Sequence, residues 1–287
     1  MTASLSGNYQ LPVRIRSIKD VDRSGHWLSE GWRDFTLAPR VSLIYGGAFV
    51  VAGLLIAIVL FTRGLGSLIL PLAGGLMILA PIMVVGLYDV SRRLEAGLPV
   101  SLRDCFRAFG RSVGQLSVLG VVLMVAYLFW VMTALLLFML FFNQSPPQFD
   151  QFFQDVVLSP PGIALLLFGG AIGAVFAWVA FAVTAVSIPL IYDRPVDAMT
   201  AIGVSLITVR ENFRVMFGWG ALIAVATAVA IATAFIGLAV VLPVVAYATW
   251  HAYRDLIAGG PVYPEDAVSP PAFRSGGDKT GAMDASG

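Results

Sequence analysis

Long uncharged apolar runs dominate the pattern of this chain. Read from one charged residue to the next, these runs cover 41–62, 64–88, 112–149, 156–192 and 215–253. Each run is longer than the roughly 20 residues that an α-helix needs to cross a bilayer. The pattern therefore predicts an all-α protein that spans a membrane several times.

The last run, 215–253, is too long for one membrane span. A continuous helix of this length would measure about 58 Å at ~1.5 Å per residue, which is about twice the hydrocarbon thickness. A turn near Phe235–Leu238, where Gly237 tolerates unusual backbone angles, would divide the run into two helices. We therefore expect six transmembrane helices arranged as three hairpins, at about 41–62, 67–88, 116–142, 162–191, 215–235 and 238–253.

The positions of the basic residues support six spans. Cytoplasmic loops are enriched in Lys and Arg, whereas translocated loops are not. With six spans, all of the 18 Lys and Arg residues except Arg63 fall on one side of the membrane. A single final span would move three C-terminal cations to the other side and weaken this asymmetry. The sequence thus predicts that both termini are cytoplasmic.

Three regions follow from this pattern. Residues 1–40 form a cytoplasmic N-terminal segment with an amphipathic helix, and residues 41–258 form the six-helix membrane domain. Residues 259–287 are rich in Gly, Pro, Ser and Asp, and they lack enough apolar side chains to build a packed core. We expect this last region to be a disordered cytoplasmic tail.

A segment with amphipathic patterning precedes the first, third and fifth spans. These segments lie at 17–38, 101–111 and 196–213, and they predict interfacial helices on the cytoplasmic side. One interpretation is a threefold repeat of an amphipathic helix and a membrane hairpin, with copies that start near 17, 98 and 195. The alternative is that Arg and aromatic residues gather at any cytoplasmic interface.

Composition adds to the membrane assignment and excludes several activities. Charged residues make up 12% of the chain, hydrophobic residues 58%, and the mean hydropathy is +0.86. The net charge of +1 gives no sign of nucleic-acid binding. The single cysteine, Cys105, and two histidines provide no metal-site spacing. No nucleotide-hydrolysis, zinc-protease or esterase motif occurs, so we expect no cofactor, no metal and no enzymatic activity.

Two polar clusters are expected at the cytoplasmic ends of the spans. The first joins residues 88–93 to 193–194, because both groups follow spans that run inward, and the second ends the sixth span. Together they could hold a phosphate or an anionic lipid headgroup, or they could form a belt of interfacial anchors and Asp–Arg pairs. The candidate residues are Tyr88, Asp89, Arg92, Arg93, Asp193, Arg194, Trp250, His251, Tyr253 and Arg254.

Several strings in the chain resemble a known family. They include Gly86–Arg93 (GLYDVSRR), Glu95–Gly97, Ala248–Arg254 (ATWHAYR) and Gly31–Phe35. These strings are similar to those of a bacterial family of integral membrane proteins without an established activity, some of which are labelled cytochrome c oxidase subunit I-like. The resemblance implies a bacterial inner membrane location. The oxidase label lacks support, because His26 and His251 are too few for haem and copper ligands.

Three functional interpretations remain open from the sequence. The leading one is a non-catalytic interaction protein, such as an accessory or assembly subunit of a membrane complex, with the lipid bilayer and other membrane proteins as partners. The alternative is a transporter or channel for a small neutral or amphipathic solute or a lipid, built on Pro-broken helices. The third is an enzyme acting on lipid or isoprenoid substrates, for which the cytoplasmic Asp and Arg groups, such as Asp89 and Asp193, are the candidates.

Overall fold

The computed structural model describes residues 13–20, 22–63, 82–142 and 158–258. Most of the second expected span, 67–88, and the whole expected tail, 259–287, lie outside the described residues. The described part is almost entirely helical, which confirms the all-α class. Its one sheet is a two-stranded antiparallel pair, in which β1 (Arg14–Ile15) lies beside β2 (Ile257–Ala258).

The described helices include both short segments and long apolar ones. In the first half of the chain they are α1 (Arg23–Leu37), α2 (Pro39–Thr62), α4 (Val85–Glu95), α5 (Leu102–Arg111) and α6 (Val113–Phe141). In the second half they are α7 (Pro160–Thr184), α8 (Ser187–Asp193), α9 (Ala198–Glu211), α10 (Phe213–Ala232) and α11 (Leu238–Leu256).

Four stretches of the described chain are long and apolar enough to cross a membrane. They are α2, α6, α7 together with α8, and α10. Helix α11, expected to be the sixth span, is not among them, because its last two turns carry polar side chains such as His251, Arg254 and Asp255. The count of six spans therefore stays a prediction.

The fourth expected span is not one continuous helix. It is broken between α7 and α8, at Ala185 and Val186. Pro189 lacks the N–H that would bond to the carbonyl of Ala185, and its ring crowds that carbonyl. At the break, the hydroxyl of Ser205 stands between two groups that a continuous helix would join, because it accepts from the N–H of Val186 at 3.1 Å and donates to the carbonyl of Ala182 at 2.7 Å.

The turn between α10 and α11 lies close to the expected position, but Gly237 has a different role. The left-handed backbone angles belong to Ala234 (φ 52°) and Phe235 (φ 67°), whereas φ of Gly237 is an ordinary −58°. A side chain at position 237 would lie 2.9 Å from the Cα of Ala230. Gly237 is therefore required by the close approach of α10 and not by the turn angle.

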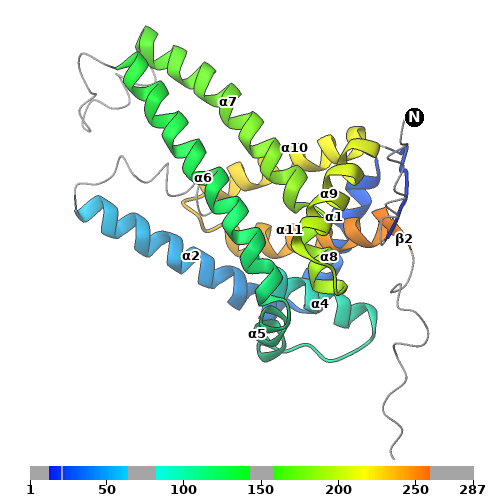
Figure 1. Ribbon diagram of the computed structural model, residues 1–287. Coiled ribbons are helices and arrows are strands. Elements are labelled where there is room, and N and C mark those ends of the chain that lie inside the picture. Colours follow the sequence, from blue (N-terminus) through cyan, green and yellow to red (C-terminus); the bar gives the residue numbers. More distant parts are fainter. Residues whose placement is uncertain (1–12, 21, 64–81, 143–157, 259–287) are drawn as a thin grey trace, which may run out of the picture.

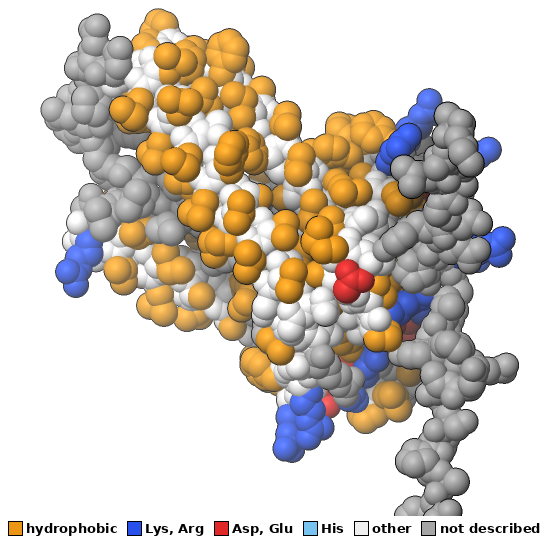
Figure 2. Space-filling view, viewed as in Figure 1, with side chains coloured by type: hydrophobic (Ala, Val, Ile, Leu, Met, Phe, Trp, Pro, Cys, Tyr) orange, Lys and Arg blue, Asp and Glu red, His pale blue; other side chains and the backbone are white. Residues whose placement is uncertain are grey.

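Helix α11 lies at the centre of the described fold. It packs against α1, α2, α4 and α10, and the long helices extend from this centre, with α6 and α7 forming a hairpin that projects away (Figure 1). The space-filling view shows apolar side chains over the projecting helices, and most of the visible Lys and Arg side chains lie along the right and lower edges of the molecule, away from these helices (Figure 2). The packed base holds a cluster of buried apolar residues together with a group of buried polar side chains, which we call the polar core and which includes Asp34, Asp89 and Ser91.

A single residue separates a short helix from a long apolar one at three places in the chain. Ala38 lies between α1 and α2, Ser112 between α5 and α6, and Asn212 between α9 and α10. The three short helices occupy the segments in which amphipathic helices were expected. Whether the three units are true repeats remains a prediction.

The buried faces of two short helices do not carry their largest apolar side chains. On α5, Cys105 and Ala108 are buried while Phe106 is exposed. On α9, the small residues Ala201 and Val204 are buried, whereas the larger Met199 is exposed. In lipid, large apolar side chains gain little from burial, and small residues allow close helix contacts.

We expect Gly46→Ala to destabilise the protein and Gly47→Ala to leave its stability nearly unchanged. A Cβ at Gly46 would lie 2.9 Å from the backbone Cα of Ala239 in α11, whereas a Cβ at Gly47 meets nothing within 4 Å. Overpacking of this kind costs about 1–3 kcal/mol. Thermal unfolding of the two detergent-solubilised variants measures the difference, and equal stability of both would contradict the α2–α11 packing.

Candidate functional site

Asp89 is the most heavily engaged carboxylate of the polar core. It lies on α4 and is almost completely buried. One of its oxygens accepts hydrogen bonds from the hydroxyl of Tyr192 on α8 and from Arg92 at 2.7 Å, and the other accepts from Arg93 at 2.9 Å. Arg92 also lies 5.1 Å from the centre of the Tyr192 ring. The first expected cluster therefore joins α4 to α8.

The environment of Asp89 favours its ionised form. Burial by itself raises the pKa of a carboxyl group, but the hydrogen bonds from Tyr192, Arg92 and Arg93 outweigh this effect and lower the pKa of Asp89 below its usual value of 3.8. Asp89 thus carries a negative charge at neutral pH. Two arginines and a phenol hold this charge, so Asp89 is not available as a general base.

Trp250 connects the second expected cluster to the first. Its ring is fully buried on α11, and it stacks on Tyr88 of α4 with ring centres 6.2 Å apart. It meets Tyr192 of α8 edge-on at 6.0 Å and Tyr253 at 5.5 Å. The two clusters therefore form one continuous polar and aromatic core between α4, α8 and α11.

Asp193 and Arg194, at the end of α8, bind the same core. The hydroxyl of Tyr253 donates to Asp193 at 2.7 Å, and Arg194 lies 3.6 Å from the same carboxylate oxygen. The arginine side chain is nearly buried. This contact fixes the end of α8 to α11.

His251 lies between two carboxylates that the sequence analysis did not select. Its Nε2 is 2.8 Å from Asp34 of α1, and its Nδ1 is 3.6 Å from Glu95 at the end of α4. Asp34 is 1% exposed and also accepts a hydrogen bond from Ser91 at 2.6 Å. Its other oxygen has no partner among the described residues. His251 therefore joins three helices at one point.

Glu95 gathers further contacts from α11. It accepts a hydrogen bond from Trp250 Nε1 at 3.2 Å, and Arg254 approaches it at 3.6 Å. Arg254 is half exposed, so this ion pair is weak.

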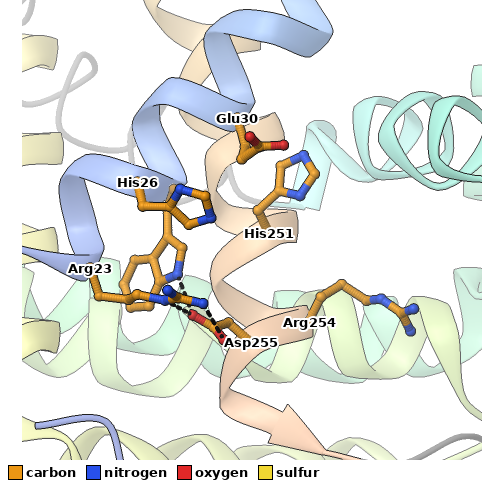
Figure 3. Close-up of a pocket in the computed structure, with 7 residues that line it drawn as sticks. Arg23, His26, Glu30, His251, Arg254 and Asp255 are labelled. Carbon is orange, nitrogen blue, oxygen red and sulfur yellow. Dashed lines mark hydrogen bonds and ion pairs between the residues drawn. The ribbon is translucent and has the colours of Figure 1, made fainter. Parts of the chain in front are cut away.

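A second pairing outside the expected clusters joins α1 to α11 near the sheet. Arg23 binds both oxygens of Asp255, at 2.5 and 3.1 Å, and Trp27 Nε1 donates to the same carboxylate at 3.0 Å. Burial raises the pKa of Asp255, but the hydrogen bonds from Arg23 and Trp27 reverse this and lower it overall. Figure 3 shows Arg23 lying against Asp255 across the gap between the two helices.

The missed residues carried a signal in the sequence. Asp34, Glu95 and Asp255 all lie within or directly beside the strings that resemble the membrane-protein family. Their role was not apparent because each contacts a residue far away in the chain; Asp34 and His251, for example, are 217 positions apart.

The arrangement offers little reactive chemistry in the described part of the chain. Burial raises the pKa of the Cys105 thiol to about 11, so this cysteine is a poor nucleophile at neutral pH. Within the described ranges, no group of three or more His, Cys, Asp or Glu side chains is placed to hold a metal ion. What the site does is tie α1, α4, α8 and α11 together through charged hydrogen bonds.

Comparison with known proteins gives a family match for part of the chain. Residues 69–193 match the model of the family described as "Predicted integral membrane protein (DUF2189)". This protein is an integral membrane protein. The matched residues include Tyr88–Arg93 and Asp193 of the polar core but not α11, and the family's description names no oxidase activity. No curated protein and no solved structure matches the chain.

We expect Asp89→Asn to lower the free energy of unfolding by about 2 kcal/mol or more. The substitution removes the charge that Arg92, Arg93 and Tyr192 share, and a hydrogen bond to a charged group contributes about 1.5–3 kcal/mol. Asp20→Asn is the matched control, because Asp20 is exposed. If thermal unfolding in detergent shows equal stability for the two variants, the structural role of Asp89 is contradicted.

The pH dependence of stability, compared between the wild type and Asp89→Asn, provides a second measurement. The pKa of Asp89 is lower in the folded than in the unfolded protein. The contribution of Asp89 to the free energy of unfolding is therefore fully present at a pH above the ordinary pKa of 3.8, and it is lost as the pH falls through the lowered pKa of the folded state. The stability difference between the wild type and Asp89→Asn should therefore shrink as the pH falls below about 4. A difference that persists unchanged in acid would argue against this assignment.

Proposed function

We propose that this protein is a non-catalytic interaction protein, such as an accessory or assembly subunit of a membrane complex. The observation that carries the proposal is the contrast between two regions. In the polar core, buried carboxylates such as Asp89 and Asp255 are held by arginine, tyrosine and tryptophan donors. In the apolar region, by contrast, few residues are buried inside the protein. The buried share of the most apolar stretch is 6% in α6 and 0% in α7 with α8.

The hairpin of α6 and α7 has a long uncovered apolar surface in the described part of the chain. Its two helices pack on each other, through Gly173 and Trp130 for example, and contact α8 and α9 mainly near their base. Met132 and Leu136 of α6 and Leu167 of α7 are each about two-thirds exposed or more. A hairpin that is held mainly at its base would become more rigid if another protein packed against its side. This supports the proposal that a partner protein binds this surface.

The proposed orientation places the polar core on the cytoplasmic side of a bacterial inner membrane. The pairing of β1 with β2 brings Arg14 beside Ala258, so these two ends of the described chain lie together. Arg63 follows the far end of α2, away from the other basic residues. Because cytoplasmic segments are rich in Lys and Arg, this distribution favours cytoplasmic termini and an even number of crossings.

Helix α5 is suited to lie at the cytoplasmic membrane surface. It packs against α4, and Phe106 beside Arg103 and Arg107 is exposed on it. An exposed aromatic ring flanked by arginines is typical of helices that lie among lipid headgroups. We infer that α5 anchors the polar core to anionic lipid.

Photo-crosslinking tests the partner surface. A benzophenone side chain at Leu136, incorporated in cells, should crosslink to a distinct protein, whereas the same group at the buried Leu123 should not. Crosslinks from Leu136 to lipid alone would contradict the interaction proposal.

Cysteine labelling tests the orientation. We expect a membrane-impermeant maleimide to modify Arg63→Cys in intact cells and to modify the exposed Arg103→Cys after permeabilisation only. The native Cys105 is buried, so background labelling is expected to be low. Labelling with the opposite pattern would place the polar core outside the cytoplasm.

A further inference from the structure

Two adjoining cavities lie where the N-terminal segment meets the end of α11. The first, of about 220 Å³, lies between α1 and α11 and is lined by His26, Glu30 and His251, among others. The second, of about 400 Å³, is lined by residues 16–20 of the N-terminal segment. Arg23 and Asp255 line both cavities. We call the two together the N-terminal cleft.

The carboxylates of the first cavity are already neutralised. Asp255 accepts two hydrogen bonds from Arg23 and one from Trp27. Glu30 forms an ion pair with Arg33 at 2.8 Å. Neither acid therefore offers an unpaired negative charge to a ligand.

Several basic groups of the cleft have no such partner. The side chains of Arg16, Lys19 and His26 form no hydrogen bond or ion pair in the part of the chain that the structure describes, and all three residues are exposed. Asp20 is the one carboxylate of the second cavity besides Asp255. The cleft thus has a surplus of positive charge.

The backbone that carries these basic groups is fixed in place. The N–H of Arg16 donates to Leu256 at 2.8 Å, directly beside the β1–β2 pair. The buried side chain of Asn212 accepts from the N–H of Ile18 at 2.6 Å and donates to the carbonyl of Arg16 at 3.0 Å. The amide oxygen and the amide nitrogen of Asn212 thus both hold the N-terminal segment in place. A segment that is already ordered loses less conformational entropy when a ligand binds.

We propose that the N-terminal cleft binds a phosphate-bearing anion through Arg16, Lys19 and His26. In Figure 3, His26 and Glu30 of α1 and His251 of α11 face a common space, with Arg23 beside it on Asp255 and Arg254 extending away from α1. This inference does not depend on the proposed interaction role, because it concerns the polar end of the molecule and not its apolar faces.

Calorimetric titration of the full-length protein with inorganic pyrophosphate tests the cleft. In nanodiscs of phosphatidylcholine we expect saturable binding that weakens as salt is added. The double variant Arg16→Gln/Lys19→Gln should bind at least about tenfold more weakly, because it loses two charge-assisted contacts. Arg40→Gln is the matched control, since Arg40 is exposed on α2 and lines neither cavity, and it should bind as the wild type does.

A second lipid composition separates the two sources of phosphate. If a lipid headgroup is the natural occupant, nanodiscs containing phosphatidylglycerol should weaken pyrophosphate binding to the wild type by competition, and this effect should vanish in the double variant. If a free phosphate compound is the occupant, the two lipid compositions should give the same affinity. Absence of saturable binding in both lipids, or equal binding by the wild type and the double variant, would overturn the proposal.

Discussion

A charge buried in a protein must be paired, and this constraint organises the described fold. Asp34, Asp89, Asp193 and Asp255 approach one another in space around α11, although they come from four different helices. Each meets a donor on another helix, as when Tyr192 of α8 binds Asp89 of α4 and Arg23 of α1 binds Asp255 of α11. Removing one member of a buried pair costs far more than the pair contributes. The helices are therefore held together as a set.

The apolar helices follow a different rule. They are surrounded by lipid or by partner helices, so apolar burial does not drive them together, and close contacts depend on small residues instead. A Cβ at Gly46 of α2 would lie 2.9 Å from the Cα of Ala239 in α11, and a Cβ at Gly173 of α7 would lie 3.0 Å from the ring of Trp130 in α6. Close packing at the base and open faces beyond it are what this rule predicts. The polar core fixes the geometry of the helices, and the open faces remain available for other proteins.

Features that depend on one segment alone could be predicted from the sequence, whereas contacts between distant segments could not. The apolar runs predicted α2, α6, α7 and α10, since length and hydropathy are properties of each segment alone. The expected direction of the spans predicted that residues 88–93 and 193–194 meet, because both groups follow spans expected to run inward. Asp34 and Glu95 could not be assigned, since their partners on α11 lie 217 and 155 positions away and depend on how helices are rotated.

The central claim is that the polar core is structural and that the protein acts through contacts with other membrane proteins. The most direct measurement is purification of the native chain from its source membrane in nanodiscs, followed by mass spectrometry of the intact particle. Our account predicts a second protein in fixed stoichiometry with this chain. A chain that is consistently recovered alone, with a specific small molecule or lipid bound, would contradict it and favour transport or lipid handling.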